Sequence, residues 1–187
     1  YNKAADGSAV GKRIFLEAEK AAIEYSRALD TEAGPTRVQK AKVALYDKLV
    51  YSKIKAAVGG SAWYGITGGS AMSQDLGHFF RGMGLPIYEG YGLTETSPVV
   101  CANPHGEHSR LGTVGLPVPG TTLKVIDDEG NALPLGERGE LCVKGPQVMK
   151  GYWQRPDATA EVLADDGWFR TGDIGRVDED GFFAVVD

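Results

Sequence analysis

Two short segments of the chain carry side chains that are suited to binding a nucleotide. Residues 91–98 read Tyr-Gly-Leu-Thr-Glu-Thr-Ser-Pro, and residues 170–173 read Arg-Thr-Gly-Asp. The ring of Tyr91 offers a face for stacking on a base, and the carboxylate of Glu95 suits a hard cation placed between it and a phosphate. Asp173 lies on a glycine turn, where a carboxylate can accept both hydroxyls of a ribose. Together the segments predict a site for a nucleotide, its Mg²⁺ and its ribose.

A third segment, residues 67–72 (Thr-Gly-Gly-Ser-Ala-Met), comes between an expected strand and an expected helix. The glycines allow the backbone to approach a flat ligand, and helix N–H groups favour anions. No Gly-Lys-Ser/Thr follows, so this is not a phosphate loop of the Walker type. Each of the three segments alone is compatible with an ordinary turn whose polar side chains satisfy the local backbone. Their occurrence in one chain favours the nucleotide site.

Composition narrows the class of protein. The chain has 187 residues, of which 42% are hydrophobic and 24% are charged. This usage is typical of a folded domain, and the length suits one domain or parts of two. The net charge of −5 is uneven: residues 1–60 carry 11 basic and 7 acidic side chains, and residues 61–187 carry 9 and 18. The acidic remainder argues against nucleic acid as a partner, because phosphate backbones need a basic surface.

Cys101 and Cys142 lie far apart, in apolar runs, without the spacing of a metal site. We therefore expect two buried free thiols in a reducing compartment, and a cytoplasmic protein. The sequence shows neither an apolar stretch long enough to span a bilayer nor a secretory leader. It begins at Tyr1 and its last strand-like run stops at Asp187, so we expect a piece of a larger protein.

The residues that could do chemistry must be positioned by an α/β fold with three zones. Apolar residues at three- and four-residue steps predict helices over 8–29 and 36–57, a helical pair within residues 1–60. In residues 61–120, a strand near 63–66, a helix over 73–83 with Ser73 as N-cap and a strand over 85–89 predict a βαβ part of a mixed sheet with parallel pairing. Residues 121–187 predict a small β-rich, barrel-like subdomain, with strands over 121–126 and 140–144 and a helix from Pro156 to about 163.

The helix expected over 36–57 is basic and amphipathic. Such a helix can lie on an anionic membrane surface, which would add a peripheral membrane contact to the cytoplasmic location. The simpler interpretation, which we favour, is a helix packed on the protein with one solvated basic face. The basic arc is Arg37, Lys40, Lys48 and Lys55, and the opposite apolar arc is Val38, Leu45, Leu49, Val50 and Ile54.

The order and density of motifs between residues 61 and 187 resemble the central part of adenylate-forming enzymes, and specifically the long-chain fatty-acid–CoA ligases. The helical pair over residues 1–60 resembles the long-chain branch. The matching segments are residues 68–72 (Gly-Gly-Ser-Ala-Met), 89–96 (Glu-Gly-Tyr-Gly-Leu-Thr-Glu-Thr), 112–117 (Gly-Thr-Val-Gly-Leu-Pro), 139–145 (Gly-Glu-Leu-Cys-Val-Lys-Gly), 150–153 (Lys-Gly-Tyr-Trp), 166–173 (Asp-Gly-Trp-Phe-Arg-Thr-Gly-Asp) and 180–187 (Asp-Gly-Phe-Phe-Ala-Val-Val-Asp).

This resemblance implies an activity. The carboxylate of a fatty acid attacks ATP to give an acyl-adenylate and pyrophosphate, and CoA then displaces AMP to give the thioester. It implies that Tyr91 stacks on adenine, that Thr94 donates to the phosphate, that Glu95 holds Mg²⁺ and that Asp173 binds the ribose. Thr94 and Glu95 are thus the candidate catalytic residues. It also assigns the nucleotide-binding backbone to Gly68, Gly69, Ser70, Glu89, Gly90 and Gly92, and the hinge between two domains to Asp187.

The resemblance also implies that a phosphate loop precedes residue 1 and that a small domain with a lysine follows Asp187, so we expect the chain alone to be inactive. Three alternatives stay open. The parent could be a ligase for an aryl or shorter acid, an enzyme that passes its adenylate to a carrier protein, or a non-catalytic nucleotide-binding module.

Overall fold

A computed structural model describes residues 9–70 and 72–186, and it divides the chain into two compact units. The first, here called the helical unit, comprises residues up to 65 together with 72–87. The second, here called the β unit, comprises residues 66–71 and 88–187. The predicted hinge residue Asp187 and Ala71 of the glycine-rich segment lie outside the described residues.

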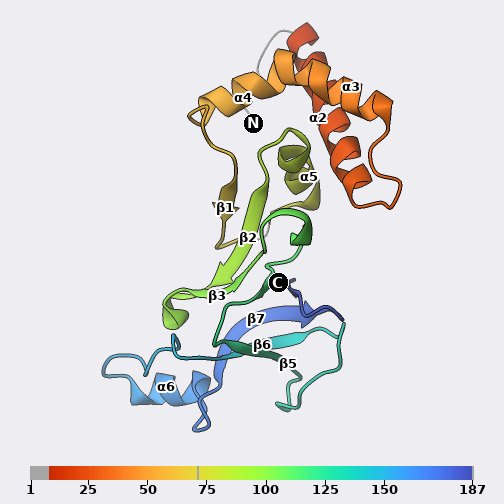
Figure 1. Cartoon of the computed structure of the whole chain (residues 1–187). Coiled ribbons are helices and arrows are strands. Elements are labelled where there is room, and N and C mark those ends of the chain that lie inside the picture. The colour runs from red at the N-terminus through yellow and green to blue at the C-terminus, as the bar shows by residue number, and fades with distance from the viewer. Residues whose placement is uncertain (1–8, 71, 187) are drawn as a thin grey trace. The chain divides into compact units, whose positions relative to one another are not determined.

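The helical unit contains α2 (Ala9–Leu29), α3 (Arg37–Tyr46), α4 (Ser52–Ala57) and α5 (Gln74–Gly82), and a π-helical turn (Asp47–Tyr51) joins α3 to α4 (Figure 1). Thr36 and Gln39 form a reciprocal capping box that starts α3. The Ser73 hydroxyl accepts from the backbone N–H of Leu76 at 3.3 Å and caps α5, as predicted. The three predicted helices are confirmed, but the π turn inside the second one was not predicted.

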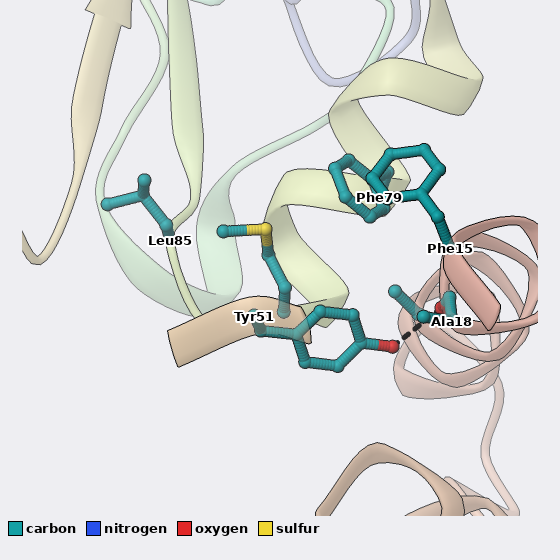
Figure 2. Packing of buried hydrophobic residues seen from close by; sticks show 7 residues of the cluster. Phe15, Ala18, Tyr51, Phe79 and Leu85 are labelled. Atoms are coloured by element: carbon teal, nitrogen blue, oxygen red, sulfur yellow. Dashed lines mark hydrogen bonds between the residues drawn. The ribbon is translucent and has the colours of Figure 1, made fainter. Parts of the chain in front are cut away.

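The core of the helical unit is aromatic and aliphatic (Figure 2). Tyr51 is fully buried at the end of the π turn, and its hydroxyl donates to the backbone carbonyl of Ala18 at 2.6 Å. Burial in this core raises the pKa of Tyr51 well above its usual value. The buried members are Phe15, Ala18, Ala22, Tyr51, Phe79, Met83 and Leu85.

The π turn lies within the predicted apolar arc, and the structure divides this arc between two surfaces. A π turn adds a residue to the helical repeat and so changes which side chains face a neighbour. Val50 and Ile54 pack against the core. Val38, Leu45 and Leu49 remain 66%, 55% and 46% exposed. The prediction of a single apolar arc is therefore wrong, because the arc divides into a packed part and an exposed part.

Helices α2 and α5 approach closely at Gly82. A Cβ atom at this position would lie 2.0 Å from the backbone carbonyl oxygen of Ala22. Only glycine allows the two backbones to meet at this distance. Two ion pairs between the same helical segments support the contact, Arg27 with Asp75 at 2.6 Å and Arg81 with Asp30 at 2.8 Å.

The first sheet has the strand order β1 (Gly65–Thr67), β2 (Ile87–Gly92), β3 (Val99–Ala102) and β4 (Leu116–Pro117). β1 and β2 run in the same direction with α5 between them in the chain (Figure 1), while β2–β3 and β3–β4 are antiparallel. The predicted βαβ part of a mixed sheet is therefore confirmed. Its second strand begins at Ile87, later than predicted, because Leu85 still closes the end of α5 with a hydrogen bond to Phe80 O at 2.9 Å.

The second sheet is antiparallel, with the order β5 (Thr122–Ile126), β6 (Gly139–Lys144), β7 (Phe169–Val177) and β8 (Phe183–Val185). The short helix α6 (Pro156–Val162) begins at Pro156 as predicted. Cys101 and Cys142 are buried free thiols, again as predicted, and burial raises the pKa of Cys101 to about 12. None of the described helices combines the length and the apolar character needed to cross a membrane.

Candidate functional site

Most of the predicted site residues lie in the β unit, beginning at the end of β2. Tyr91 pairs with Cys101 of β3, and a register shift follows between Tyr91 and Gly92. A Cβ atom at Gly92 would lie 2.1 Å from the carbonyl oxygen of Pro98. The strand must therefore carry glycine here so that residues 93–98 can fold back against it. The N–H of Leu93 closes this loop on the same carbonyl at 3.0 Å.

Within the loop, Thr94–Thr96 form one short 3-10 turn in which the two threonines differ. Thr96 is fully buried, and its hydroxyl accepts from Leu93 N at 3.0 Å and donates to Pro98 O at 2.5 Å. Ser97 follows with φ of 55°, a left-handed conformation that ends the turn. Thr96 thus holds the turn in shape, whereas Thr94 is exposed and Glu95 is half-buried. The loop presents a hydroxyl and a carboxylate side by side.

The second predicted segment is a turn within β7 that is supported by β6. The Thr171 hydroxyl donates to Leu141 O at 2.8 Å and accepts from Asp173 N at 3.1 Å. Glu140 accepts from Gly172 N at 3.0 Å and from the guanidinium of Arg170 at 2.5 Å. The backbone before Asp173 is therefore held from both sides. Sequence reasoning did not assign this supporting role to Glu140.

The structure brings the two predicted segments together. The hydroxyl of Tyr91 donates to Oδ2 of Asp173 at 2.5 Å, across 82 positions of the chain. Burial, followed by this bond to a carboxylate, raises the pKa of Tyr91 well above its usual value, so the phenol stays protonated. A ring that can stack on a base and a carboxylate that can accept ribose hydroxyls thus lie next to each other.

Glu95 has a partner that sequence reasoning missed. The hydroxyl of Tyr152 donates to Oε1 of Glu95 at 2.8 Å, and Met149 N donates to the backbone carbonyl of Glu95 at 2.7 Å. The hydrogen bond to the carboxylate raises the pKa of Tyr152. The only sequence signal was the place of Tyr152 inside the matching segment 150–153.

A cleft of about 390 Å³ opens beside these residues. Glu95 and Tyr152 line it together with the turn that precedes Asp173. Its wall consists of Leu93, Glu95, Glu140, Tyr152, Glu161, Val162, Phe169, Arg170, Thr171 and Gly172.

The glycine-rich segment lies next to β2. A Cβ atom at Gly68 would come within 3.3 Å of the carbonyl oxygen of Gly90, and Gly69 has φ of +85°. Gly68, Gly69 and Ser70 are exposed, so their backbone is open to a ligand. Glu89 is buried with 7% exposure, and its backbone carbonyl accepts from Asn103 N at 3.0 Å.

The side chains that could coordinate the predicted Mg²⁺ are few. Among the described residues, no three histidine, cysteine or acidic side chains gather into a metal site. Mg²⁺ usually binds through one or two carboxylates and takes its other ligands from phosphates and water. A single half-buried carboxylate beside an exposed threonine hydroxyl fits a cation that arrives with a nucleotide.

Comparison with known proteins agrees with a nucleotide site of this geometry. The family described as "AMP-binding enzyme" matches residues 20–153. The chain belongs to this family. Over its full length it is 46% identical to the long-chain-fatty-acid–CoA ligase FadD15 of Mycobacterium tuberculosis, of which it covers 29%. It is also 59% identical over 104 residues to the long-chain-fatty-acid–CoA ligase of Salmonella typhimurium, covering 56% of the chain and 18% of that ligase.

Two solved structures extend this family assignment to the fold. ATP-bound MatB from Rhodopseudomonas palustris matches 64% of the chain with a TM-score of 0.61 and 38% identity, over 24% of its own length. The N-terminal domain of FACL13 from Mycobacterium tuberculosis matches 66% of the chain with a TM-score of 0.59 and 34% identity, over 31% of its own length. The α/β fold expected from sequence is that of part of an AMP-binding enzyme. The chain spans less than a third of the length of these relatives.

Proposed function

We propose that the chain is a central part of an ATP-dependent long-chain fatty-acid–CoA ligase and supplies one wall of its nucleotide site. The observation that carries this proposal is the hydrogen bond between Tyr91 and Asp173, which joins two distant segments of matching residues at 2.5 Å. The relatives named as long-chain-fatty-acid–CoA ligases support the substrate class. The proposed reaction converts a fatty acid, ATP and CoA to acyl-CoA, AMP and pyrophosphate.

In this site Tyr91 stacks on adenine, with the backbone of Gly68, Gly69 and Ser70 on the other face of the base. Asp173 accepts the ribose hydroxyls. Its hydrogen bond from Tyr91 uses Oδ2, and a carboxylate has further acceptor positions that remain for the ribose. The glycines Gly90 and Gly92, with Glu89, shape the strand that carries the ring.

Thr94 and Glu95 serve the phosphates. The exposed hydroxyl of Thr94 donates to a phosphate oxygen of ATP, and after the first step it donates to a phosphate oxygen of the acyl-adenylate. Glu95 would hold Mg²⁺, which would supply positive charge beside the phosphate at which the reaction takes place. None of these residues has to form a covalent bond to the substrate, since positioning and charge stabilisation account for most of such catalysis.

Release of AMP by the complete ligase that contains this chain tests the proposal. The enzyme is incubated with Mg·ATP and a panel of aryl, short-chain and long-chain acids, with and without CoA. We expect AMP with long-chain acids and a thioester only when CoA is present. AMP without a thioester would favour transfer to a carrier protein, and AMP only with aryl or short acids would favour another ligase. Binding of ATP with no AMP from any acid would favour a non-catalytic module.

We further propose that the helical stretch over residues 37–57 contacts an anionic membrane surface. It carries six basic side chains and one acidic side chain, Asp47, which pairs with Lys55 at 2.6 Å. The exposed part of the apolar arc, Val38, Leu45 and Leu49, lies on the same stretch. Basic residues beside exposed apolar ones are typical of helices that lie in a lipid interface.

Co-sedimentation of the complete ligase with anionic vesicles tests this contact. A variant with glutamine at Arg37, Lys40, Lys48 and Lys55 should bind less than the wild type, and neutral vesicles should bind both weakly. Equal binding of both proteins, or no binding of either, would contradict the proposal and would favour the solvated basic face.

A further inference from the structure

Tyr152 is tied to Glu95 more firmly than its exposed position suggests. Its side chain is 37% exposed, yet its hydroxyl donates to Oε1 of Glu95 at 2.8 Å over a separation of 57 positions. The same loop reaches the backbone of Glu95, because Met149 N donates to Glu95 O at 2.7 Å. Two hydrogen bonds from one loop therefore fix both the main chain and the carboxylate of Glu95.

The loop itself is anchored to the first turn of α6. Tyr152 N donates to the hydroxyl of Thr159 at 2.9 Å, and this hydroxyl donates to Arg155 O at 2.8 Å. A Cβ atom at Gly151, which has φ of +144°, would lie 2.8 Å from the Thr159 side chain. Tyr152 is thus presented by a loop with defined hydrogen bonds of its own.

The bond leaves half of the Glu95 carboxylate available. Tyr152 donates to Oε1, and among the described residues no side chain or backbone group donates to Oε2. A carboxylate that is fixed through one oxygen presents the other in a defined direction. Partners of this kind orient metal-binding carboxylates in proteins, and their removal weakens metal binding.

We propose that Tyr152 is a positioning residue for Glu95: its hydroxyl holds the carboxylate in the orientation in which Oε2 meets the cation that accompanies the nucleotide. In this role Tyr152 acts through Glu95 and not on the nucleotide or the reacting atoms. The inference rests on the proposed function, in which Glu95 serves Mg²⁺. Tyr152 comes from a different loop than the other site residues. Loss of its hydroxyl should alter how ATP affinity depends on Mg²⁺, and should not alter binding of the base or ribose.

The test is Tyr152→Phe in the complete ligase, which removes the hydroxyl and keeps the ring. ATP affinity is measured by calorimetry without any fatty acid, so that no turnover contributes. In saturating Mg²⁺ we expect affinity to fall about three- to tenfold, the loss of one hydrogen bond. With EDTA in place of Mg²⁺ the variant and wild type should bind ATP alike. Trp153→Phe, at a neighbouring ring that is 88% exposed, is the control and should change neither value.

A second pair of variants separates positioning from a general structural role. Glu95→Gln should weaken Mg²⁺-dependent binding more than Tyr152→Phe, and the double variant should be no weaker than Glu95→Gln alone. Additive losses, equal losses with and without Mg²⁺, or wild-type affinity in Tyr152→Phe would overturn the inference. If the wild-type enzyme itself bound ATP without any Mg²⁺ dependence and released no AMP, the proposed function would fail and the inference with it.

Discussion

The helical unit and the β unit each have a buried apolar core, but they differ in the part that polar side chains play. In the helical unit, buried apolar side chains and a close approach of two backbones at Gly82 define the interior. In the β unit, hydroxyls and carboxylates link distant loops, as in the pairs Tyr91–Asp173 and Tyr152–Glu95. Substitutions in the core of the helical unit should therefore act on stability, whereas polar substitutions in these β-unit pairs should act mainly on ligand binding.

The largest effect that we expect is on the stability of the helical unit. Gly82→Ala places a methyl group 2.0 Å from Ala22 O. Because the clash is with backbone atoms, it can be relieved only if α2 moves away from α5. We expect a loss of about 3 kcal/mol, at the upper end for overpacked sites. Urea unfolding of the 187-residue chain measures it. Gly65→Ala is the control, because its Cβ would meet Ile87 at an ordinary 3.6 Å. Similar unfolding midpoints for both variants would contradict the close approach.

The comparison is sharpened by Asp173→Ala, which should act mainly on binding and should cost about 1 kcal/mol of stability through the lost hydrogen bond from Tyr91. Removal of a carboxylate that accepts hydroxyl hydrogen bonds should weaken ATP affinity of the complete ligase by about 1.5–3 kcal/mol, or roughly ten- to a hundredfold. Calorimetric ATP binding and thermal unfolding are measured on the same preparations. Asp166→Ala, at an exposed turn before β7, is the control. Unchanged ATP affinity in Asp173→Ala would show that this carboxylate does not bind the nucleotide.

A smaller effect is expected for Tyr51→Phe in the helical unit. The variant keeps the buried ring and loses the hydrogen bond to Ala18 O, which should cost about 1 kcal/mol of stability. Tyr46→Phe, at a half-buried ring 6.5 Å from that of Tyr51, provides the matched control. If both variants unfold at the same urea concentration as the wild type, the buried hydrogen bond does not stabilise the unit.

The same contrast explains what could be predicted from sequence. Periodicity predicted helices 8–29 and 73–83 closely, because an amphipathic pattern and a cap such as Ser73 are local signals. The π turn over Asp47–Tyr51 was not predicted. It depends on the packing of Tyr51 against α2, and a contact between distant segments leaves no local sequence pattern. The second strand was placed too early for a similar reason, since the buried Leu85 completes a helical core rather than a sheet.

For the candidate site, residue types and spacing identified Tyr91, Glu95 and Asp173, whose chemistry is evident in short motifs. They did not predict that Tyr91 bonds directly to Asp173, because that bond joins residues 82 positions apart. Glu140 and Tyr152 were missed as partners for the same reason. A supporting residue is recognised by its contact, and contacts between distant segments depend on the fold.

The smallest effect that we expect is a pH dependence in the helical unit, centred on His78. Its ring Nδ1 lies 3.0 Å from the hydroxyl of the fully buried Ser26. Burial lowers the pKa of His78 below its usual 6.5. Within each nearby pair, Arg27–Asp75 and Arg81–Asp30, the carboxylate raises this pKa and the guanidinium lowers it. The unfolded chain therefore takes up the proton first as the pH falls.

It follows that His78 leaves stability unchanged well above pH 6.5 and lowers it progressively as the pH falls below that value. Because the ring is partly exposed, the loss should be smaller than that of Tyr51→Phe. Urea unfolding at pH 8 and pH 5.5 should show a larger decrease for the wild type than for His78→Gln, whose side chain does not titrate. His108→Gln, at an exposed position of the β unit, should behave as the wild type. Equal decreases in the wild type and His78→Gln would show that protonation of His78 is not coupled to folding of the helical unit.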